Sequence, residues 1–271
     1  HEIFMSNLRL RIIFGSIYVA LMVGGTVLGV PYFGMLMALI AFLSLHEMSV
    51  LAKKESAQHL WLNPMLFAGV ILYINFVDAR QVGLNHFVAA WMLQMVSLYF
   101  SYTGLKNNSI LNYISTSLYL WLPIGLLAMW FNQNHTTSTE YILFYLIAIW
   151  LYDSMAYVVG KWLGKTPIFP KVSPKKTIEG TLGGAIVTVL IMSVLNTYWL
   201  RLEEPMYLLT IVIIFFATFG DFVESFMKRK LGVKDSGTLI PGHGGILDRL
   251  DSIYLSALPF IIILIVLQSK S

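Results

Sequence analysis

Long, separate apolar runs dominate this sequence, and most of them can cross a lipid bilayer. A spanning helix needs about 20 apolar residues at a rise of about 1.5 Å each. Because 57% of the residues are hydrophobic and only 12% are charged, water is not the main solvent. We predict an all-α, polytopic integral membrane protein with about nine transmembrane helices. These cover residues 12–30, 32–51, 60–77, 86–102, 110–131, 141–159, 182–200, 207–227 and 253–267.

The distribution of Lys and Arg predicts the orientation. Short cytoplasmic loops of membrane proteins are enriched in these two residues. With the N-terminus cytoplasmic and the C-terminus outside, fifteen of the eighteen fall on the cytoplasmic side, and only Arg80, Arg201 and Lys270 fall outside. A net charge of +4 is compatible with nucleic-acid binding, but this one-sided pattern is typical of membrane topology. No nucleic-acid partner is expected.

Two cytoplasmic loops differ from the others. Loops 160–181 and 228–252 hold ten of the fifteen inside charges. We therefore predict a region of N-terminal transmembrane helices, 1–109, and a C-terminal catalytic transmembrane region, 110–271, which contains both loops. Cysteine is absent, which excludes disulfides and metal sites built on thiolates.

Four carboxylates lie within or at the ends of the predicted spans. A charge at a helix centre costs about 2.5–3.5 kcal/mol, so each needs a partner, a cavity or a function. Asp153 has no basic residue within one turn, which favours a functional role over a hydrogen bond to Ser154. Glu47 lies beside His46, and we interpret it as part of a structural pair. The other two are Asp221 and Glu224.

Asp221 and Glu224 share one face of the eighth predicted helix. They are three residues apart, and Ser225 lies on the same face. An ion pair with Lys228 or Arg229 explains Glu224 as well as a functional role does. Asp221 lies deeper in the helix, which favours a role in function.

The first polar loop ends in a Ser-Pro-Lys-Lys-Thr stretch, 173–177, just before a helix. Gly180, Gly183 and Gly184 fall in the first turns of that helix, where free N–H groups suit a phosphate. Lysines that flank a membrane helix and small residues that pack helices together are the alternative explanation. The spacing does not match a Walker loop.

The second polar loop alternates cations, carboxylates and glycines. Nucleotidyl transfer requires cations to neutralise the triphosphate, carboxylates to hold a divalent metal, and a flexible backbone. Asp248 and Asp251 are three apart, so a helix that starts near Ile246 presents them together. They could instead cap the last helix, although Gly244 and Gly245 directly before them favour an open site.

These motifs resemble the signature of the phosphatidate cytidylyltransferases, the CDP-diacylglycerol synthases. The upstream stretch 173–180 and Asp153 match the same family. Before about residue 110 the match is limited to apolar spans, so nothing is carried over to that part. The matching positions of the second loop are Ser225, Lys228, Arg229, Lys234, Asp235, Pro241, His243, Gly244, Gly245, Asp248, Arg249 and Asp251.

The resemblance implies that a phosphate oxygen of phosphatidic acid attacks the α-phosphorus of CTP and that pyrophosphate leaves. It also implies a requirement for Mg²⁺, bound by Asp221 and Asp248 with Asp251 as a third ligand; a second metal ion is left open. The expected catalytic residues are Asp221, Asp248, Arg249 and Lys228. The expected substrate-binding residues are Asp153, Ser173, Lys175, Lys176, Thr177, Ser225, Arg229, Lys234, His243, Gly244 and Gly245.

Two other functions fit a membrane protein with these loops. A CTP-dependent lipid kinase would transfer the γ-phosphate to an alcohol. A membrane transporter would place charges near the bilayer midplane or on both sides. The expected partners are CTP, phosphatidic acid and membrane lipid, and homo-oligomerisation is left open. The expected location is the bacterial inner (plasma) membrane, with the active site facing the cytoplasm.

Overall fold

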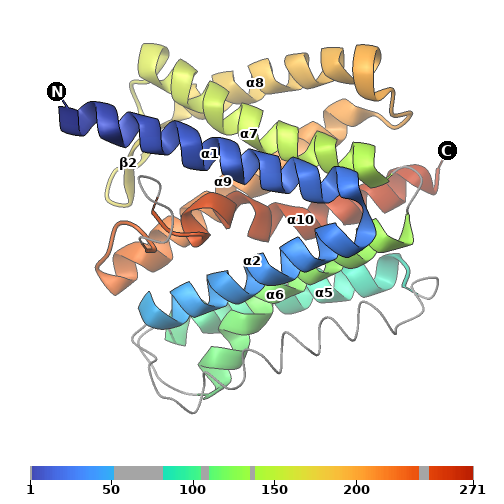
Figure 1. The fold of residues 1–271 in the computed structure, drawn as a ribbon, viewed down its shortest axis with the longest axis horizontal. Helices are drawn as coiled ribbons and strands as arrows, with labels where there is room; N and C mark the ends of the chain where they lie inside the picture. The colour runs from blue at the N-terminus through green and yellow to red at the C-terminus, as the bar shows by residue number, and fades with distance from the viewer. Residues whose placement is uncertain (1, 52–81, 105–109, 135–137, 238–243, 271) are drawn as a thin grey trace.

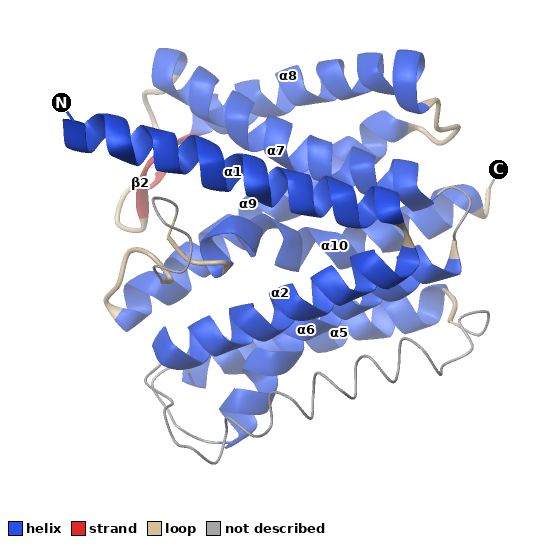
Figure 2. Ribbon diagram, in the orientation of Figure 1, coloured by secondary structure: helices blue, strands red, loops and turns tan. Residues whose placement is uncertain are grey.

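A computed structural model describes residues 2–51, 82–104, 110–134, 138–237 and 244–270 as a bundle of helices (Figures 1 and 2). The elements are α1 (Glu2–Leu28), α2 (Val30–Leu51), α5 (Leu84–Gly104), α6 (Ile110–Gln133), α7 (Ser138–Leu163), β1 (Pro167–Phe169), β2 (Ser173–Thr177), α8 (Ile178–Leu195), the π-helical η2 (Asn196–Leu200), α9 (Met206–Leu231) and α10 (Leu247–Gln268).

Eight of the nine predicted spans coincide with described helices, and the third, 60–77, lies outside the described residues. In the part of the chain that is described, six helices are long and apolar enough to cross a membrane, and α1 adds the shorter stretch Ile12–Leu28. Helix α5, which covers the marginal fourth segment, is not among the six. The helical membrane-protein class is confirmed, and the number nine stays a prediction.

Helix α10 lies at the centre of the bundle, where α9, α6, α5 and α2 pack around it (Figure 1). Its residues from 252 to 261 are all buried. Hydrogen bonds join some of the polar groups between helices: Gln94 donates to the carbonyl of Tyr254, and the hydroxyls of Tyr145 and Ser256 are 2.6 Å apart. Such interhelical hydrogen bonds supplement van der Waals packing in membrane bundles.

Helices α7 and α8 are held close together by glycines. A Cβ on Gly180 would lie 2.8 Å from the Cα of Gly160, and one on Gly184 would lie 2.6 Å from the Cα of Ala156. These distances are too short for a side chain, so the glycines at the start of α8 serve helix packing. The structure therefore supports helix packing, and not an approach of phosphate, as the explanation for these glycines.

The polar segments are shorter and more ordered than predicted. Loop 160–181 contains the last turn of α7 and an antiparallel hairpin of β1 and β2. Helix α9 continues to Leu231 and ends at Gly232, whose φ of +79° suits glycine. The predicted boundaries were wrong here because basic residues in the last turn of a helix stabilise its C-terminal end and extend it beyond the apolar run.

The polar segments gather at one end of the bundle. The start of α1, the β1–β2 hairpin, residues 232–237 and the start of α10 lie toward the left of Figure 1, and the end of α10 lies at the right. The described parts of the two polar loops therefore lie at the same end of the bundle.

Candidate active site

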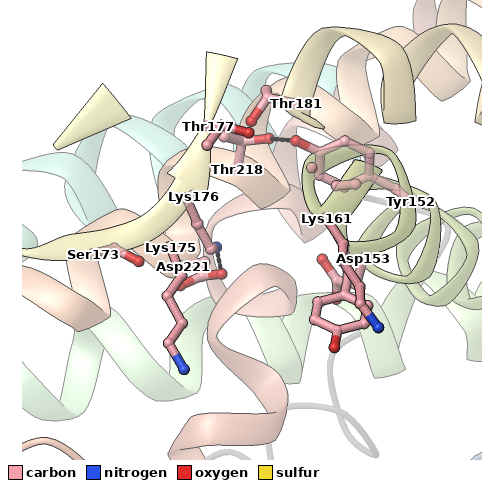
Figure 3. A pocket seen from close by; sticks show the side chains of 13 residues that line it. Tyr152, Asp153, Lys161, Ser173, Lys175, Lys176, Thr177, Thr181, Thr218 and Asp221 are labelled. Carbon is pink, nitrogen blue, oxygen red and sulfur yellow. Dashed lines mark hydrogen bonds and ion pairs between the residues drawn. The ribbon is translucent and has the colours of Figure 1, made fainter. Parts of the chain in front are cut away.

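Two pockets that share Asp153 and Asp221 lie at the polar end of the bundle. The first, of about 590 Å³, is called the cationic pocket because Lys161, Lys175 and Lys176 line it (Figure 3). The second, of about 450 Å³, is called the carboxylate pocket. Its polar lining includes Asp153, Asp221, Asp248, Arg249 and Asp251.

The hairpin positions the lysines of the cationic pocket. Thr177, at the end of β2, caps α8 by accepting a hydrogen bond from the N–H of Gly180 at 3.2 Å. This cap fixes the point where β2 meets α8, and Ser173, Lys175 and Lys176 of β2 line the pocket. Lys161, which was not among the expected site residues, lines the pocket from the end of α7 (Figure 3).

Lys176 lies where the two pockets meet. Its ammonium forms an ion pair with Asp221 (Figure 3) and lies 5.3 Å from the centre of the Phe222 ring. Burial lowers the pKa of Lys176, although the nearby carboxylates of Asp251 and Asp153 act to raise it. A partly desolvated cation of this kind binds a phosphate oxygen more strongly than a fully hydrated one.

The carboxylate pocket receives acidic side chains from three helices. Asp153 comes from α7, Asp221 from α9, and Asp248 and Asp251 from the first turns of α10. Ser225 donates to Asp221 at 3.4 Å, and Asp251 accepts from the N–H of Ser252 at 2.7 Å. Carboxylates that are far apart in the sequence therefore face one cavity.

Asp248 is more constrained than the sequence indicated. Its Oδ1 lies 2.6 Å from the ammonium of Lys228, which also lies 2.7 Å from Glu224. Its Oδ2 accepts from the N–H groups of Ser236 and Gly245, both at 2.8 Å. The structure therefore forms the Glu224–Lys228 ion pair that was one of the two explanations for Glu224.

The other described site residues of the prediction are not among those that line the two pockets. Arg229 donates to the carbonyls of Val172 at 3.2 Å and Val233 at 2.8 Å, and so joins the hairpin to the segment after α9. Lys234 is exposed. Gly244 has a φ of +86°, a conformation that suits glycine. His243 lies outside the described residues.

The donors present suit Mg²⁺, although they do not form a complete protein cage. No group of three His, Cys, Asp or Glu side chains within metal-binding distance occurs among the described residues. Mg²⁺ is usually bound by one or two carboxylates together with substrate phosphates and water. Two or more carboxylates beside a pocket of lysines match that pattern.

An apolar pocket of about 200 Å³ adjoins the carboxylate pocket. Phe14, Tyr18 and Arg249 line both of them. The rest of its lining comes from α1, α2 and the start of α10. Because α1 and α2 have the composition of ordinary membrane helices, this pocket could not be predicted from the sequence.

Cations and carboxylates beside an apolar pocket, at one end of a membrane bundle, define a site for a substrate that carries both phosphate and hydrocarbon. The model of the cytidylyltransferase family matches residues 9–267. The chain therefore belongs to that family.

Similar proteins include three phosphatidate cytidylyltransferases from staphylococci. That of Staphylococcus haemolyticus is 34% identical over 257 residues, which cover 91% of this chain and 92% of the relative. That of Staphylococcus epidermidis is 33% identical over 250 residues, covering 86% and 91%. That of Staphylococcus aureus strain COL is 32% identical over 241 residues, covering 84% and 90%.

Proposed function

We propose that this chain transfers the cytidylyl group of CTP to the phosphate of phosphatidic acid, which gives CDP-diacylglycerol and pyrophosphate. The observation that carries the proposal is that three pockets adjoin one another in a row. The cationic and carboxylate pockets share Asp153 and Asp221, and the carboxylate and apolar pockets share Arg249. A triphosphate, a reacting phosphorus and the hydrocarbon of a lipid can therefore lie side by side. The names of the relatives support the same activity.

The cationic pocket binds the triphosphate of CTP. Lys161, Lys175 and Lys176 supply three positive charges, and hydroxyls such as that of Ser173 supply hydrogen bonds. When CTP binds, the ammonium of Lys176 leaves Asp221 and contacts a phosphate oxygen. Asp221 then becomes available to another cation.

In the carboxylate pocket, Asp221 and Asp248 would hold Mg²⁺ together with substrate phosphates, and Asp251, which lines the same pocket, would be a further candidate ligand. Bound Mg²⁺ supplies charge neutralisation for the phosphates and for the departing pyrophosphate. In the absence of substrate, Lys176 and Lys228 compensate the charges of these two aspartates. Both aspartates therefore already have a cationic partner within the protein.

Arg249 holds the phosphate of phosphatidic acid at the boundary between the carboxylate and apolar pockets. Its guanidinium offers two parallel N–H donors to a phosphate, and the acyl region lies along Phe14 and Tyr18. The attacking oxygen is already anionic near neutral pH, so the reaction needs no strong general base.

The proposed function is tested by comparing two acceptor lipids, phosphatidic acid and diacylglycerol. Purified protein with CTP should convert phosphatidic acid and leave diacylglycerol unchanged, because the nucleophile is a phosphate oxygen. Lipid products are separated by chromatography and identified by mass spectrometry. Phosphorylation of diacylglycerol would instead establish the CTP-dependent kinase. A transporter is disfavoured because the described acidic and basic residues of the pockets crowd one end of the bundle.

The active site faces the cytoplasm of the bacterial inner membrane in this proposal, as the distribution of Lys and Arg indicates. Because the chain has no cysteine, Lys234→Cys and Glu203→Cys are clean probes; both positions are exposed. An impermeant thiol reagent added to intact cells should label position 203 and spare position 234. The opposite labelling would place the polar loops outside and contradict the orientation.

A further inference from the structure

Glu47, in the last turns of α2, contacts the second polar segment. Its Oε2 accepts hydrogen bonds from the hydroxyl of Ser236 at 2.9 Å and from the N–H of Leu247 at 2.8 Å. These partners lie 189 and 200 residues further along the chain. The predicted pair with His46 is not formed between these two described residues, and His46 is exposed. Glu47 therefore connects the N-terminal helices to the catalytic region.

Glu47 caps the N-terminus of α10, although it belongs to a different helix, α2. Leu247 is the first residue of α10, and Ile246, at the N-cap position, has no side chain that accepts a hydrogen bond. The first N–H groups of a helix lack partners within the helix and carry partial positive charge. The carboxylate of Glu47 satisfies one of them and is itself stabilised by the helix end.

Glu47 and Asp248 bind the same short pieces of backbone. Ser236 donates its hydroxyl to Glu47 and its N–H to Asp248, and Gly245 donates its N–H to Asp248. A Cβ on Gly237 or on Gly245 would collide with Oε1 of Glu47. Both glycines are therefore needed for the carboxylate to approach this closely.

We infer that Glu47 is a positioning residue for the reaction: it fixes the start of α10 and the Ser236 segment, and these together orient Asp248 in the carboxylate pocket. The inference rests on the proposed function for its effect on turnover. It gives α2 a part in the site beyond lining the apolar pocket. Glu47 does not contact either substrate, and it influences Asp248 only through Ser236 and Leu247.

The inference is tested with Glu47→Ala, Glu47→Gln and the exposed control Glu203→Gln. Loss of an outer residue that orients a ligand typically costs about 10–100-fold in activity, so kcat of Glu47→Ala should fall by that amount with little change in KM for CTP. Glutamine keeps a carbonyl oxygen that can accept both hydrogen bonds, and Glu47→Gln should recover most of kcat. Glu203→Gln should match the unmodified protein.

Hydrogen exchange provides a readout that does not depend on turnover. Without substrate, Glu47→Ala should speed exchange in the peptides that contain Ser236 and Leu247 and leave α6 unchanged. If Glu47→Ala fails to fold, Gly237→Ala replaces it, because the added Cβ displaces the carboxylate and should give the same two effects. Unchanged exchange, or unchanged kcat in an active protein, would overturn the inference. If the unmodified protein were inactive, the proposed function would be rejected. The exchange result alone would then test whether Glu47 orders the Ser236 segment and the start of α10.

Discussion

Asp221→Asn is expected to lower kcat by about 100-fold or more, the loss typical when one electrostatic group is removed from a reaction centre. Asp221 lines both the cationic and the carboxylate pockets, so it lies where the triphosphate and the metal would meet. Asn keeps the size of the side chain and removes its charge. Initial rates with CTP and phosphatidic acid, measured over a range of Mg²⁺ concentrations, check the prediction.

The fold should survive this change. The side chain of Lys176, the partner of Asp221, keeps 34% of its surface exposed, so water can solvate the ammonium that loses its counterion. The matched control is Asp251→Asn, which should reduce turnover less because Asp251 also accepts the N–H of Ser252 at the start of α10. Near-normal turnover and Mg²⁺ dependence in Asp221→Asn would make Asp221 a structural partner of Lys176.

Asp248→Asn should lose turnover to a similar extent and should also destabilise the protein. The side chains of Asp248 and Lys228 are only 8% and 13% exposed. Removing one partner of a buried ion pair costs roughly 3–5 kcal/mol, because the other charge stays buried. Glu224 remains 2.7 Å from Lys228 and offsets part of that cost. Thermal unfolding in detergent should therefore shift downward by several degrees in Asp248→Asn and much less in Asp221→Asn.

Neutralising the whole cluster separates stability from catalysis at this position. Combining Asp248→Asn with Lys228→Gln and Glu224→Gln leaves no unpaired charge among the three buried side chains, so the thermal midpoint should rise back toward that of the unmodified protein while turnover stays low. If the triple variant also regained turnover, Asp248 would act only as a partner for Lys228, and its role in binding Mg²⁺ would be wrong.

The helical part of the fold could be predicted because a chain inside lipid must satisfy its own backbone hydrogen bonds, which makes each long apolar run a helix. The β1–β2 hairpin could not be predicted in the same way. Its first strand has three residues and starts with Pro167, and its second contains Pro174. Proline is unfavourable in most strand positions, so the local sequence indicates a loop. The strands depend on their pairing with each other and on the contacts of β2 with α7 and α8.

The charged part of the site could be predicted because carboxylates in membrane helices are costly and therefore few. Asp153 and Asp221 were found in this way, and Asp248 was found from the alternating cations, carboxylates and glycines of the second polar loop. Glu47 was assigned to a neighbour, His46, because its actual partners lie about 200 residues away in the sequence. The apolar pocket was missed for a related reason: side chains of α1 and α2 that line it have the same composition as side chains that face lipid.

The central claim is tested most directly by determining which phosphorus of CTP is transferred to the lipid. Purified protein is given phosphatidic acid with CTP labelled at the α-phosphorus in one reaction and at the γ-phosphorus in another, with Asp221→Asn prepared in the same way as the control for contaminating activity. We predict that the α-label enters the organic phase as CDP-diacylglycerol and that the γ-label stays in water as pyrophosphate. Recovery of the γ-label in the lipid, with release of CDP, would contradict cytidylyl transfer.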